Sequence, residues 1–466
     1  MEAVQEQHQT PIPSLPGQFL VGNTLQFTRD PLGILLKIHR DYERIVKTRL
    51  VGRDIYVLTH PDDAKRVLQE ANRNYHKSEA YRVLGIFLGN GLLNSEGDFW
   101  RRQRRLAQPA FYKQRLALLA DTMAAAGQQL VEKWWKADPT KPVDVSVDMM
   151  ELTLNIVTKA LFGADVSQKL TGMSESMNTI IEFAHETLVS FIRIPLRYPT
   201  PRNLAFRRAV QRVENLIYDI INTRRTELAA NPDVRHDDLL DMLLRARDEE
   251  TGEGMTDQQL RDEVTTIFMA GHETTAVAMS WTLYLLAQHP DIARQVRREV
   301  LEVVGPTAQP GYDHLRELKF TMQVIQESMR LYPPAWLISR RSLGPDQFGD
   351  YAVGENTYVF ISPYALHRDP SQWAFPNAFH PDHFLPERQR DRHPYAYIPF
   401  GGGPRLCIGN NFALMEMQIL LAQLVRAFDV SLAAPHQDVK AEASVTLRPK
   451  GGMKLRVRMA TNAVGE

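Results

Sequence analysis

Hydrophobic side chains recur at helical spacing along most of this chain, and the pattern predicts a mainly α-helical protein. Amphipathic stretches of this kind cover residues 98–110, 115–136, 145–163, 205–230, 236–248, 256–289, 290–304, 317–331 and 410–426. Alternating or β-branched stretches are fewer and lie at 45–51, 55–58, 351–362 and 443–458, and the turn signal Arg448-Pro-Lys-Gly-Gly452 breaks the last of them. The first two flank Gly52-Arg53-Asp54, which is typical of a hairpin. The pattern therefore predicts a mainly α (α+β) fold with a small β-rich region.

The sequence has no internal repeat, low-complexity tract or flexible linker. We therefore expect a single domain over residues 1–466, with a helical body at 61–331 and 409–427. The β-rich parts near 45–58, 351–362 and 443–458 are expected to form one small sheet region from both ends of the chain.

The longest helical stretch is 256–289. It begins at a capping box, Thr256-Asp-Gln-Gln259, and ends at His289-Pro290. At 1.5 Å per residue it spans roughly 50 Å, enough to cross a whole domain.

Composition and charge narrow the class of protein. Hydrophobic residues make up 44% and charged residues 24%, which suits a globular protein with a large core. Lys+Arg and Asp+Glu are equal at 55 each, so net charge favours neither nucleic acid nor an anionic membrane. The N-terminal stretch MEAVQEQHQTPIPSLPG is polar and proline-rich, with neither a signal-peptide core nor a spanning segment. Since one cysteine suits a reducing compartment, these features predict a cytoplasmic enzyme with no membrane anchor and no nucleic-acid partner.

Candidate chemistry is concentrated at Phe400-Gly-Gly-Gly-Pro-Arg-Leu-Cys407-Ile-Gly409, which holds the only cysteine of the chain. The start of the predicted helix 410–426 lowers the pKa of a neighbouring thiol, and glycines let the backbone approach a bulky group. This combination suits a thiolate ligand of a haem iron. Three alternatives stand beside it: a buried cysteine that acts as a small hydrophobe, a phosphate loop, and a catalytic nucleophile. No Lys-Ser or Lys-Thr follows the loop, and no histidine and asparagine partners stand out for a nucleophile.

A second motif, Ala270-Gly271-His272-Glu273-Thr274-Thr275, lies inside the long helical stretch. Gly271 costs about 1 kcal/mol relative to alanine in a helix interior, so it needs a local reason. Glu273 is a carboxylate in a largely uncharged run. A membrane-spanning helix and a glutamate that reaches a solvent patch are the alternatives. The functional interpretation is a glycine-loosened turn where the Thr274 hydroxyl and the Glu273 carboxylate hold water beside a cofactor.

The pattern Phe-x-x-Gly-x-Arg-x-Cys-x-Gly resembles the haem-binding signature of the cytochrome P450 family, with every fixed position present. The hexapeptide around Glu273 is similar to the family's oxygen-activation motif, and the resemblance covers essentially the whole chain. It implies the cytochrome P450 fold and a haem b (iron protoporphyrin IX) with Cys407 as the metal ligand. It also implies that Glu273 and Thr274 are catalytic, relaying protons through ordered water while one oxygen atom of dioxygen enters a substrate C–H bond.

The resemblance also implies further cofactor-binding residues. They are Phe400, Gly401, Arg405 and Gly409 around the cysteine, Ala270 and Gly271 in the long helix, and Trp100, Arg104 and Arg340 elsewhere. Trp100 and Arg104 share one helix face, and a haem carries two carboxylates that would neutralise inward-facing cations. Arg341 is adjacent to Arg340 and is the alternative for its role.

Glu327-Ser-Met-Arg330 places a carboxylate and a guanidinium one helical turn apart. An isolated pair of this kind is usually a weak surface salt bridge. It also matches the Glu-x-x-Arg element of the family, which is completed by an arginine from a later segment. This sequence has Phe379-His-Pro-Asp-His-Phe384 there, so we expect His383 to make a weaker or pH-dependent contact in its place.

Candidate substrate contacts follow from the resemblance and are mostly apolar, so a hydrophobic small-molecule substrate is expected. They are Leu84, Phe87, Phe183, Leu188, Phe191, Thr266, Ala335, Trp336, Leu337 and Thr446. Ordinary core packing is the alternative for each of them. A fatty acid is the preferred substrate class, with a terpenoid, carotenoid or steroid as the alternative.

A basic cluster, formed by Arg101, Arg102, Arg105, Lys113 and Arg115, is either a solvated helix face or a docking surface for an acidic electron-transfer protein. No flavin or iron–sulfur domain follows the cysteine-loop helix, so electrons are expected from a separate ferredoxin or flavodoxin with its reductase. A peroxide-using haem enzyme and a non-catalytic haem sensor are the remaining alternatives.

Overall fold

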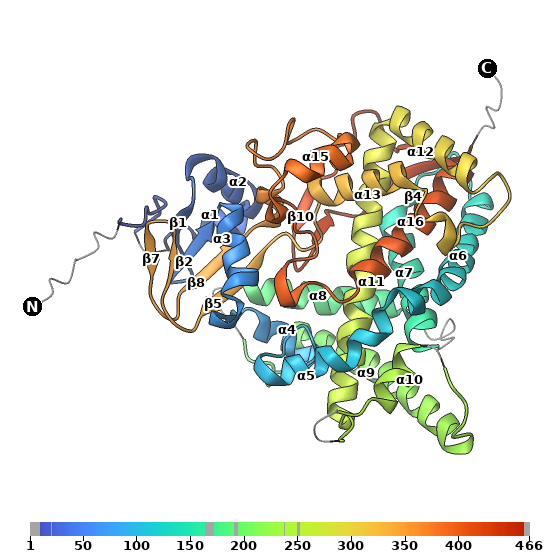
Figure 1. Cartoon of the computed structure of the whole chain (residues 1–466), viewed down its shortest axis with the longest axis horizontal. Coiled ribbons are helices and arrows are strands. Elements are labelled where there is room, and N and C mark those ends of the chain that lie inside the picture. Colours follow the sequence, from blue (N-terminus) through green and yellow to red (C-terminus); the bar gives the residue numbers. More distant parts are fainter. Residues whose placement is uncertain are drawn as a thin grey trace, which may run out of the picture. The chain divides into compact units, whose positions relative to one another are not determined.

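The computed structural model describes residues 10–19, 21–163, 172–190, 194–236, 238–248 and 252–460. The chain divides into two compact units. The first comprises Met1–Tyr81, Ala335–Ala378 and Pro386–Cys407, and the second Arg82–Pro334, Phe379–Leu385 and Ile408–Glu466. Each unit is built from segments that are distant in sequence, as the colours in Figure 1 show. The expectation of a single domain stays a prediction.

The first unit contains a five-stranded sheet. Its order is β1 (Ile45–Leu50), β2 (Arg53–Leu58), β8 (Tyr358–Ile361), β5 (Ile338–Ser342) and β3 (Tyr75–Lys77). β1 and β2 are antiparallel with Ile45 opposite Leu58, so the predicted hairpin is present. β2 runs parallel to β8, which joins the early and late segments of the chain. Side chains of the sheet such as Ile45, Leu58 and Val359 belong to one buried cluster with Phe348.

Short elements surround this sheet in the first unit. The helices are α1 (Thr24–Arg29), α2 (Pro31–Asp41), α3 (Pro61–Lys65), α14 (Pro363–Leu366) and α15 (Pro386–Asp391). Single turns are η1 (Arg66–Glu70), η2 (Asn72–Asn74), η7 (Pro394–Ala396) and η8 (Gly403–Arg405). β6 (Asp346–Phe348) and β7 (Tyr351–Val353) form a separate hairpin. This unit ends at Cys407, within the loop formed by residues 400–409 (the cysteine loop).

The second unit is mainly helical. Its helices are α4 (Tyr81–Leu88), α5 (Gly97–Ala107), α6 (Lys113–Trp135), α7 (Val145–Phe162), α8 (Met173–Val189), α9 (Pro201–Ala230), α10 (Leu239–Arg245), α11 (Asp257–Gln288), α12 (Pro290–Val303), α13 (Lys319–Leu331) and α16 (Asn410–Ala427). Short turns are η3 (Gln108–Phe111), η5 (Tyr312–His314) and η6 (Pro381–Phe384). α11 passes through this unit and packs along α7, α13 and α16 (Figure 1). None of the helices in the described ranges is both long enough and apolar enough to cross a bilayer.

The capping box predicted for the long helix is present. The Thr256 hydroxyl accepts the amide of Gln259, and the Gln259 side chain accepts the amide of Thr256. Helices occur at each predicted position, although the stretch predicted at 236–248 forms a helix only over Leu239–Arg245. The helical pattern did not indicate α4 or α8 as separate helices.

The late strands differ from expectation. The stretch 351–362 supplies β8 beside β2, as predicted, but 443–458 does not join that sheet. It divides into β11 (Leu447–Pro449), which pairs with β10 (Ala441–Ala443), and β12 (Lys454–Met459). β12 lies between β9 (Phe428–Leu432) and β4 (Val143–Asp144). The predicted break is present between β11 and β12, and Gly451 and Gly452 there both have a positive φ, which a continuous strand does not accept.

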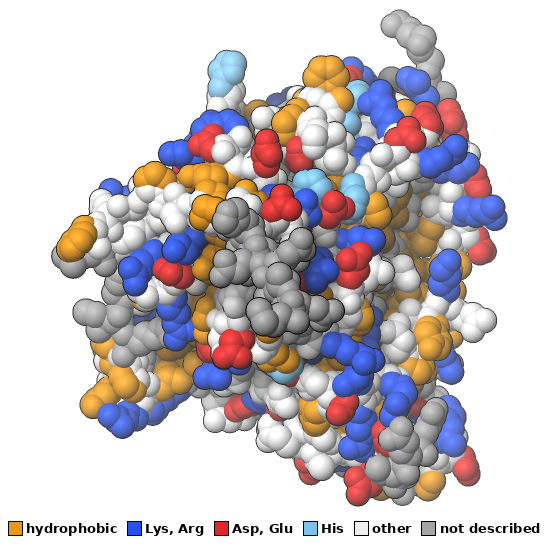
Figure 2. Space-filling model, turned by 60° about the vertical axis from the view of Figure 1, so that its left-hand side comes forward, with side chains coloured by type: hydrophobic (Ala, Val, Ile, Leu, Met, Phe, Trp, Pro, Cys, Tyr) orange, Lys and Arg blue, Asp and Glu red, His pale blue; other side chains and the backbone are white. Residues whose placement is uncertain are grey.

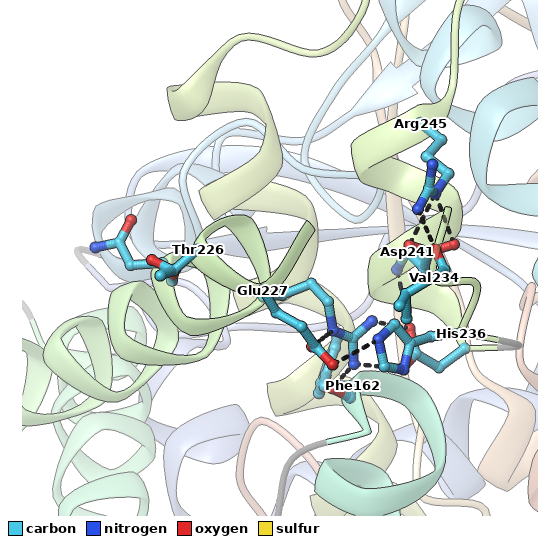
Figure 3. A network of polar contacts seen from close by, with 10 residues as sticks. Phe162, Thr226, Glu227, Val234, His236, Asp241 and Arg245 are labelled. Atoms are coloured by element: carbon cyan, nitrogen blue, oxygen red, sulfur yellow. Dashed lines mark hydrogen bonds and ion pairs between the residues drawn. The ribbon is translucent and has the colours of Figure 1, made fainter. Parts of the chain in front are cut away.

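A buried polar network fixes the connection between α9 and α10 (Figure 3). The Arg224 guanidinium donates to both carboxylate oxygens of Asp238 at 2.9 and 2.7 Å, and to the Phe162 carbonyl at 3.1 Å. Asp238 in turn accepts the Asp241 amide at 2.9 Å and so caps α10. His236 lies 3.1 Å from Glu227 on α9. These contacts tie the loop to the end of α7, so they serve the fold of the second unit.

Candidate active site

The cysteine loop has a conformation that glycine makes possible. Gly401 and Gly403 have φ values of +72° and +62°, in the left-handed region that other residues avoid. The Cys407 amide donates to the Phe400 carbonyl at 3.0 Å and closes the loop. The Cys407 residue itself is exposed. The candidate ligand residue is therefore exposed at the end of a closed backbone turn.

Close backbone packing holds this loop on the first unit. A Cβ atom on Gly403 would lie 1.9 Å from the Leu68 carbonyl oxygen of η1, and one on Gly402 would lie 2.6 Å from the Tyr395 ring. The Tyr395 hydroxyl donates to Gln69 of the same turn at 2.9 Å. Since no side chain fits at either glycine, the position of the loop is determined by η1 and Tyr395.

The two arginines of β5 have different partners. The Arg341 guanidinium donates to the Glu79 carboxylate at 2.9 Å. Arg340 is buried, with 8% of its surface exposed, and its Nη1 donates to the Ser339 carbonyl at 2.9 Å. Within the described parts of the chain, no carboxylate lies at ion-pair distance from Arg340. Arg340 therefore fits a group that brings its own anion, and Arg341 does not.

α11 is buried along almost its whole length, with one interruption. Between residues 260 and 286 every side chain is buried except at Ala270, which is exposed, and at Gly271 and Thr274, which are half-buried. Ala270 and Thr274 share a helix face, and the Thr274 hydroxyl donates to the Ala270 carbonyl at 2.7 Å. These small side chains leave a narrow uncovered stripe beside which a flat group can lie.

Gly271 has a packing role. α11 is a regular helix through this position, so the predicted glycine-loosened turn is not observed. A Cβ atom on Gly271 would lie 2.9 Å from Val157 Cγ2 of α7. Glycine is needed here because α7 and α11 approach closely.

The Glu273 carboxylate is buried and paired. Its Oε1 accepts the Thr446 hydroxyl at 2.6 Å and the Arg448 Nε at 2.7 Å. Arg448 also donates to Asn178 of α8 at 3.2 Å. Glu273 therefore lies in an ion pair with β11 and is not an isolated acid. The Thr446 hydroxyl, a predicted substrate contact, is engaged in the same cluster.

Two buried titratable groups beside this motif were not singled out from the sequence. His272 has no exposed surface, and burial together with the Arg448 charge lowers its pKa to about 3. Burial raises the pKa of Glu416 on α16 well above its ordinary value, against a smaller lowering by the Thr275 hydroxyl. The His272 side chain is therefore neutral at pH 7, and burial favours the uncharged form of Glu416. Glu416 could have been noticed as a carboxylate in the apolar run of the helix that follows Cys407.

Trp100 and Arg104 are half-buried on α5 at the predicted spacing. The Arg104 Nε donates to Gln108 at 2.8 Å, one turn further along the chain.

The predicted basic cluster is largely neutralised by internal acids. Arg102 and Arg105 approach one carboxylate oxygen of Asp248 at 3.1 and 3.0 Å, and Arg101 pairs with Asp98. Positive and negative side chains are likewise interspersed on the face drawn in Figure 2. This arrangement favours the solvated helix face over a strongly basic docking surface.

A fully buried cluster surrounds Glu327. The Arg330 Nε and Nη2 donate to its two oxygens at 2.7 and 2.8 Å. Glu327 Oε1 also accepts the His380 amide at 2.8 Å and lies 3.1 Å from His383 Nδ1. Burial raises the pKa of Glu327, but the hydrogen bonds from Arg330 and His383 outweigh it and leave the pKa below its ordinary value. The structure places His383 where the resemblance expects an arginine.

The candidate substrate residues lie in both units. In the first, Ala335 is exposed, Trp336 is buried and Leu337 is half-buried. In the second, Leu84 and Leu188 are half-buried, and Phe87, Thr266 and Thr446 are buried. The Phe183 ring stacks on Phe206 at 4.0 Å and lies under the Arg202 guanidinium at 4.4 Å, so it packs between α8 and α9. Phe191 lies outside the described residues.

Comparison with known proteins agrees with these features. A family model described as Cytochrome P450 matches residues 12–456. The chain belongs to the cytochrome P450 family. Cyclooctatin synthase of Streptomyces melanosporofaciens is 35% identical over 87% of this chain and 86% of its own length. Cyclooctat-9-en-7-ol 5-monooxygenase of the same organism is 31% identical, with the same shares covered. The crystal structure of the cytochrome P450DA heme domain aligns with a TM-score of 0.85 and 27% identity, covering 97% of this chain and 98% of that one.

As a cytochrome P450, the chain is a monooxygenase, and the expected fold is confirmed. The family uses a haem iron, dioxygen, redox partners and hydrophobic substrates. The residues present fit a haem: an exposed Cys407, an Arg340 with no carboxylate at ion-pair distance among the described residues, and the uncovered stripe at Ala270 and Thr274.

Proposed function

We propose that this cytochrome P450 inserts one oxygen atom of dioxygen into a C–H bond of a neutral, largely apolar substrate, with haem b ligated by Cys407. The observation that carries the proposal is the loop around Cys407. Its amide is bonded to the Phe400 carbonyl, its backbone needs glycine at two left-handed positions, and its sulfur-bearing residue is exposed. A loop so closely supported holds a ligand in one orientation.

Haem binding uses cations as well as the thiolate. We assign Arg340, Arg405, Trp100 and Arg104 to the propionates, because guanidinium and indole N–H groups donate to carboxylates. The bound haem would supply the activation of dioxygen, which thiolate ligation favours. Phe400, Gly401 and Gly409 would border the ligand, and the small side chain of Ala270 would give it room on α11.

Thr274 and Glu273 handle protons in this proposal. The Thr274 hydroxyl is half-buried beside the exposed Ala270 and can exchange its bond to the Ala270 carbonyl for a bond to an ordered water. Glu273 lies one residue earlier and is held by Thr446 and Arg448, so it supplies a fixed negative charge until that ion pair opens. This arrangement would deliver a proton at Thr274 Oγ1.

The candidate contacts favour a neutral substrate over a fatty acid. None of Leu84, Phe87, Thr266, Trp336 or Leu337 carries a charge, whereas a fatty-acid carboxylate needs a donor to replace its hydration. The relative named for cyclooctat-9-en-7-ol, a cyclic alcohol, points the same way. We therefore place a terpenoid-like alcohol or hydrocarbon first and a fatty acid second.

Electrons would come from a separate ferredoxin or flavodoxin with its reductase. The chain has one cysteine and so cannot build a cluster site with four cysteine ligands. A single cysteine also suits a reducing cytoplasm, where we place the enzyme.

Carbon monoxide spectroscopy tests the ligand. The reduced wild-type protein with carbon monoxide should give the spectrum of a thiolate-ligated haem, and Cys407→Ala should lose it while circular dichroism shows that the helices remain. A histidine-type spectrum in the wild type, or a thiolate spectrum in Cys407→Ala, would refute the proposal.

Turnover with ferredoxin and reductase, and none with peroxide alone, would separate the monooxygenase from a peroxide-using enzyme and from a sensor.

A further inference from the structure

The short loop between α4 and α5 lies directly on the first turns of α11, within the second unit. The Asn90 amide donates to Asp262 Oδ2 at 2.8 Å, and the Leu92 amide donates to Glu263 Oε2 at 3.0 Å. Two consecutive carboxylates of one helix thus accept two alternate amides of one loop. The loop cannot slide along α11 without breaking both bonds.

Two glycines allow the backbone of the loop to lie very close to α11. Gly89 has a φ of +66°, and a Cβ atom there would lie 2.2 Å from the Asp262 carboxyl carbon. A Cβ atom on Gly91 would lie 2.2 Å from the Thr266 hydroxyl oxygen and 2.6 Å from the Asp262 carbonyl oxygen. Only glycine is accommodated at both positions, so the loop and α11 fit each other in one register.

The carboxylates are built into the unit. Asp262 is 5% exposed and Glu263 1% exposed, and buried carboxylates persist where donors surround them. Asp262 also accepts the Gln258 side chain at 2.7 Å and Arg261 Nη1 at 3.0 Å. Arg261 pairs in addition with Glu214 of α9. The Asn90 amide therefore adds to a cluster in which Asp262 is already paired, and the Leu92 amide donates to the neighbouring Glu263.

This contact sits between the elements that carry the candidate substrate residues. The loop follows α4, which holds Leu84 and Phe87, and it touches α11 at Thr266. The buried Thr266 hydroxyl makes no hydrogen bond to the described part of the chain. A shift of the loop by a fraction of an ångström would move α4 relative to Thr266.

We propose that Asp262 and Glu263 are positioning residues that set which substrates this enzyme accepts, because they hold the loop at residues 89–92, and α4 with it, in one register on α11. The inference rests on the proposed function. The carboxylates do not touch substrate; they act through the loop amides. A purely structural role would change stability alone, whereas positioning changes the discrimination between substrates of different shape.

The test uses the haem-loaded full chain and two probes of different shape, dodecanoic acid and the cyclic terpenoid alcohol cedrol. The variants are Asp262→Asn and Glu263→Gln, which keep size and remove charge, and Asp262→Glu, which keeps charge and lengthens the side chain. Glu299→Gln is the matched control, because Glu299 accepts the Phe320 and Thr321 amides at 2.6 and 2.8 Å and holds the start of α13 in the same way.

Spectral titration of the haem gives the ratio of dissociation constants for the two probes. We expect that ratio to change by roughly fivefold or more in the Asp262 and Glu263 variants and by less than about twofold in Glu299→Gln. Unchanged ratios in every variant that retains haem, or an equal change in Glu299→Gln, would overturn the inference. If Asp262→Asn fails to fold, Asp262→Glu and Glu263→Gln decide the question. A wild-type protein without a thiolate haem spectrum would instead overturn the proposed function, and the inference with it.

Discussion

At the scale of single residues, the Thr274 hydroxyl is set apart from the other helical hydroxyls by its surroundings. Thr274 and Thr282 both donate to the carbonyl four residues earlier, at 2.7 and 2.8 Å. Thr282 is fully buried, whereas Thr274 lies on the uncovered stripe. Of these two hydroxyls, only that of Thr274 can therefore reach a bound molecule.

Replacement of this hydroxyl tests proton delivery. We expect Thr274→Ala to keep its haem and its electron uptake but to release about tenfold more peroxide per product formed, since general acid steps contribute at least that much. Thr282→Ala removes an equivalent helical bond and should leave the coupling of electron use to product unchanged. Peroxide and product are measured together under steady turnover. Unchanged coupling in Thr274→Ala would argue against the relay.

The burial of His272 leads to a second prediction at this scale, which concerns the stability of the fold at acidic pH. Its folded-state pKa of about 3 lies below the ordinary 6.5, so the unfolded chain takes up a proton that the folded chain does not. Stability is therefore lost as pH falls from 6.5 towards 3, by up to about 5 kcal/mol for this group. Glu416 changes stability with pH in the opposite direction. Its raised pKa lowers the free energy of unfolding as pH rises above 4.5.

Urea unfolding at several pH values measures this effect. His272→Asn should flatten the fall in the free energy of unfolding between pH 6.5 and 4, whereas His436→Asn, at an exposed position, should leave the slope as in the wild type. Equal slopes in all three proteins would show that His272 is not the source of acid sensitivity.

Some of these residue roles were accessible from sequence and others were not. The cysteine loop and the motif around Glu273 are local patterns, so spacing alone located them. The partners of Glu273 lie 173 and 175 residues away, at Thr446 and Arg448, and no local pattern reports a contact at that separation. The choice between Arg340 and Arg341 also depended on a distant residue, Glu79.

At the scale of elements, the Glu327 cluster fixes the end of α13 against η6. It joins residues from two segments, 327–330 and 380–383, through four bonds to one carboxylate. Glu327 and Arg330 have no exposed surface, so bulk water solvates neither charge.

Removal of the carboxylate is therefore expected to be costly. Glu327→Ala should lower the free energy of unfolding by about 3–5 kcal/mol, because it leaves the Arg330 guanidinium buried without its partner. Glu70→Ala removes the partner of the exposed Lys65 and should cost less than about 1 kcal/mol. Urea midpoints compare the two variants. Similar losses in both would mean that the cluster contributes no more than a surface pair.

Elements were predicted correctly where the hydrophobic pattern repeats over a long stretch of sequence. α11 and its capping box are examples, since a helix of 32 residues repeats its pattern many times. β10 and β11 have three residues each, too few to show a period, and their pairing depends on the turn between them. The strand partners of the stretch 443–458 therefore could not be predicted from its sequence.

At the scale of the whole molecule, the residues that we assign to haem binding and proton delivery come from several distant segments. Cys407, Arg340 and Thr274 are contributed by a loop, a strand and a helix that are far apart in sequence. A molecule that binds the folded chain and not the unfolded one stabilises it by mass action.

Haem removal should accordingly lower the melting temperature. At a haem concentration a thousandfold above its dissociation constant, the stabilisation is about 4 kcal/mol, so the apoprotein should melt several degrees below the holoprotein. Circular dichroism melts of the two forms give the difference. Identical melting temperatures would mean that the chain holds haem too weakly to serve as its resident cofactor.

The exposed Cys407 also determines how the protein can be oxidised during storage. With one cysteine per chain, oxidation cannot form an internal crosslink. The exposed Cys407 thiol can then only form a disulfide with a second chain or with another thiol compound, or be oxidised to the sulfenic and sulfinic acids. A metal bond to that sulfur would protect it, so covalent dimers should accumulate in stored apoprotein and stay rare in the loaded enzyme.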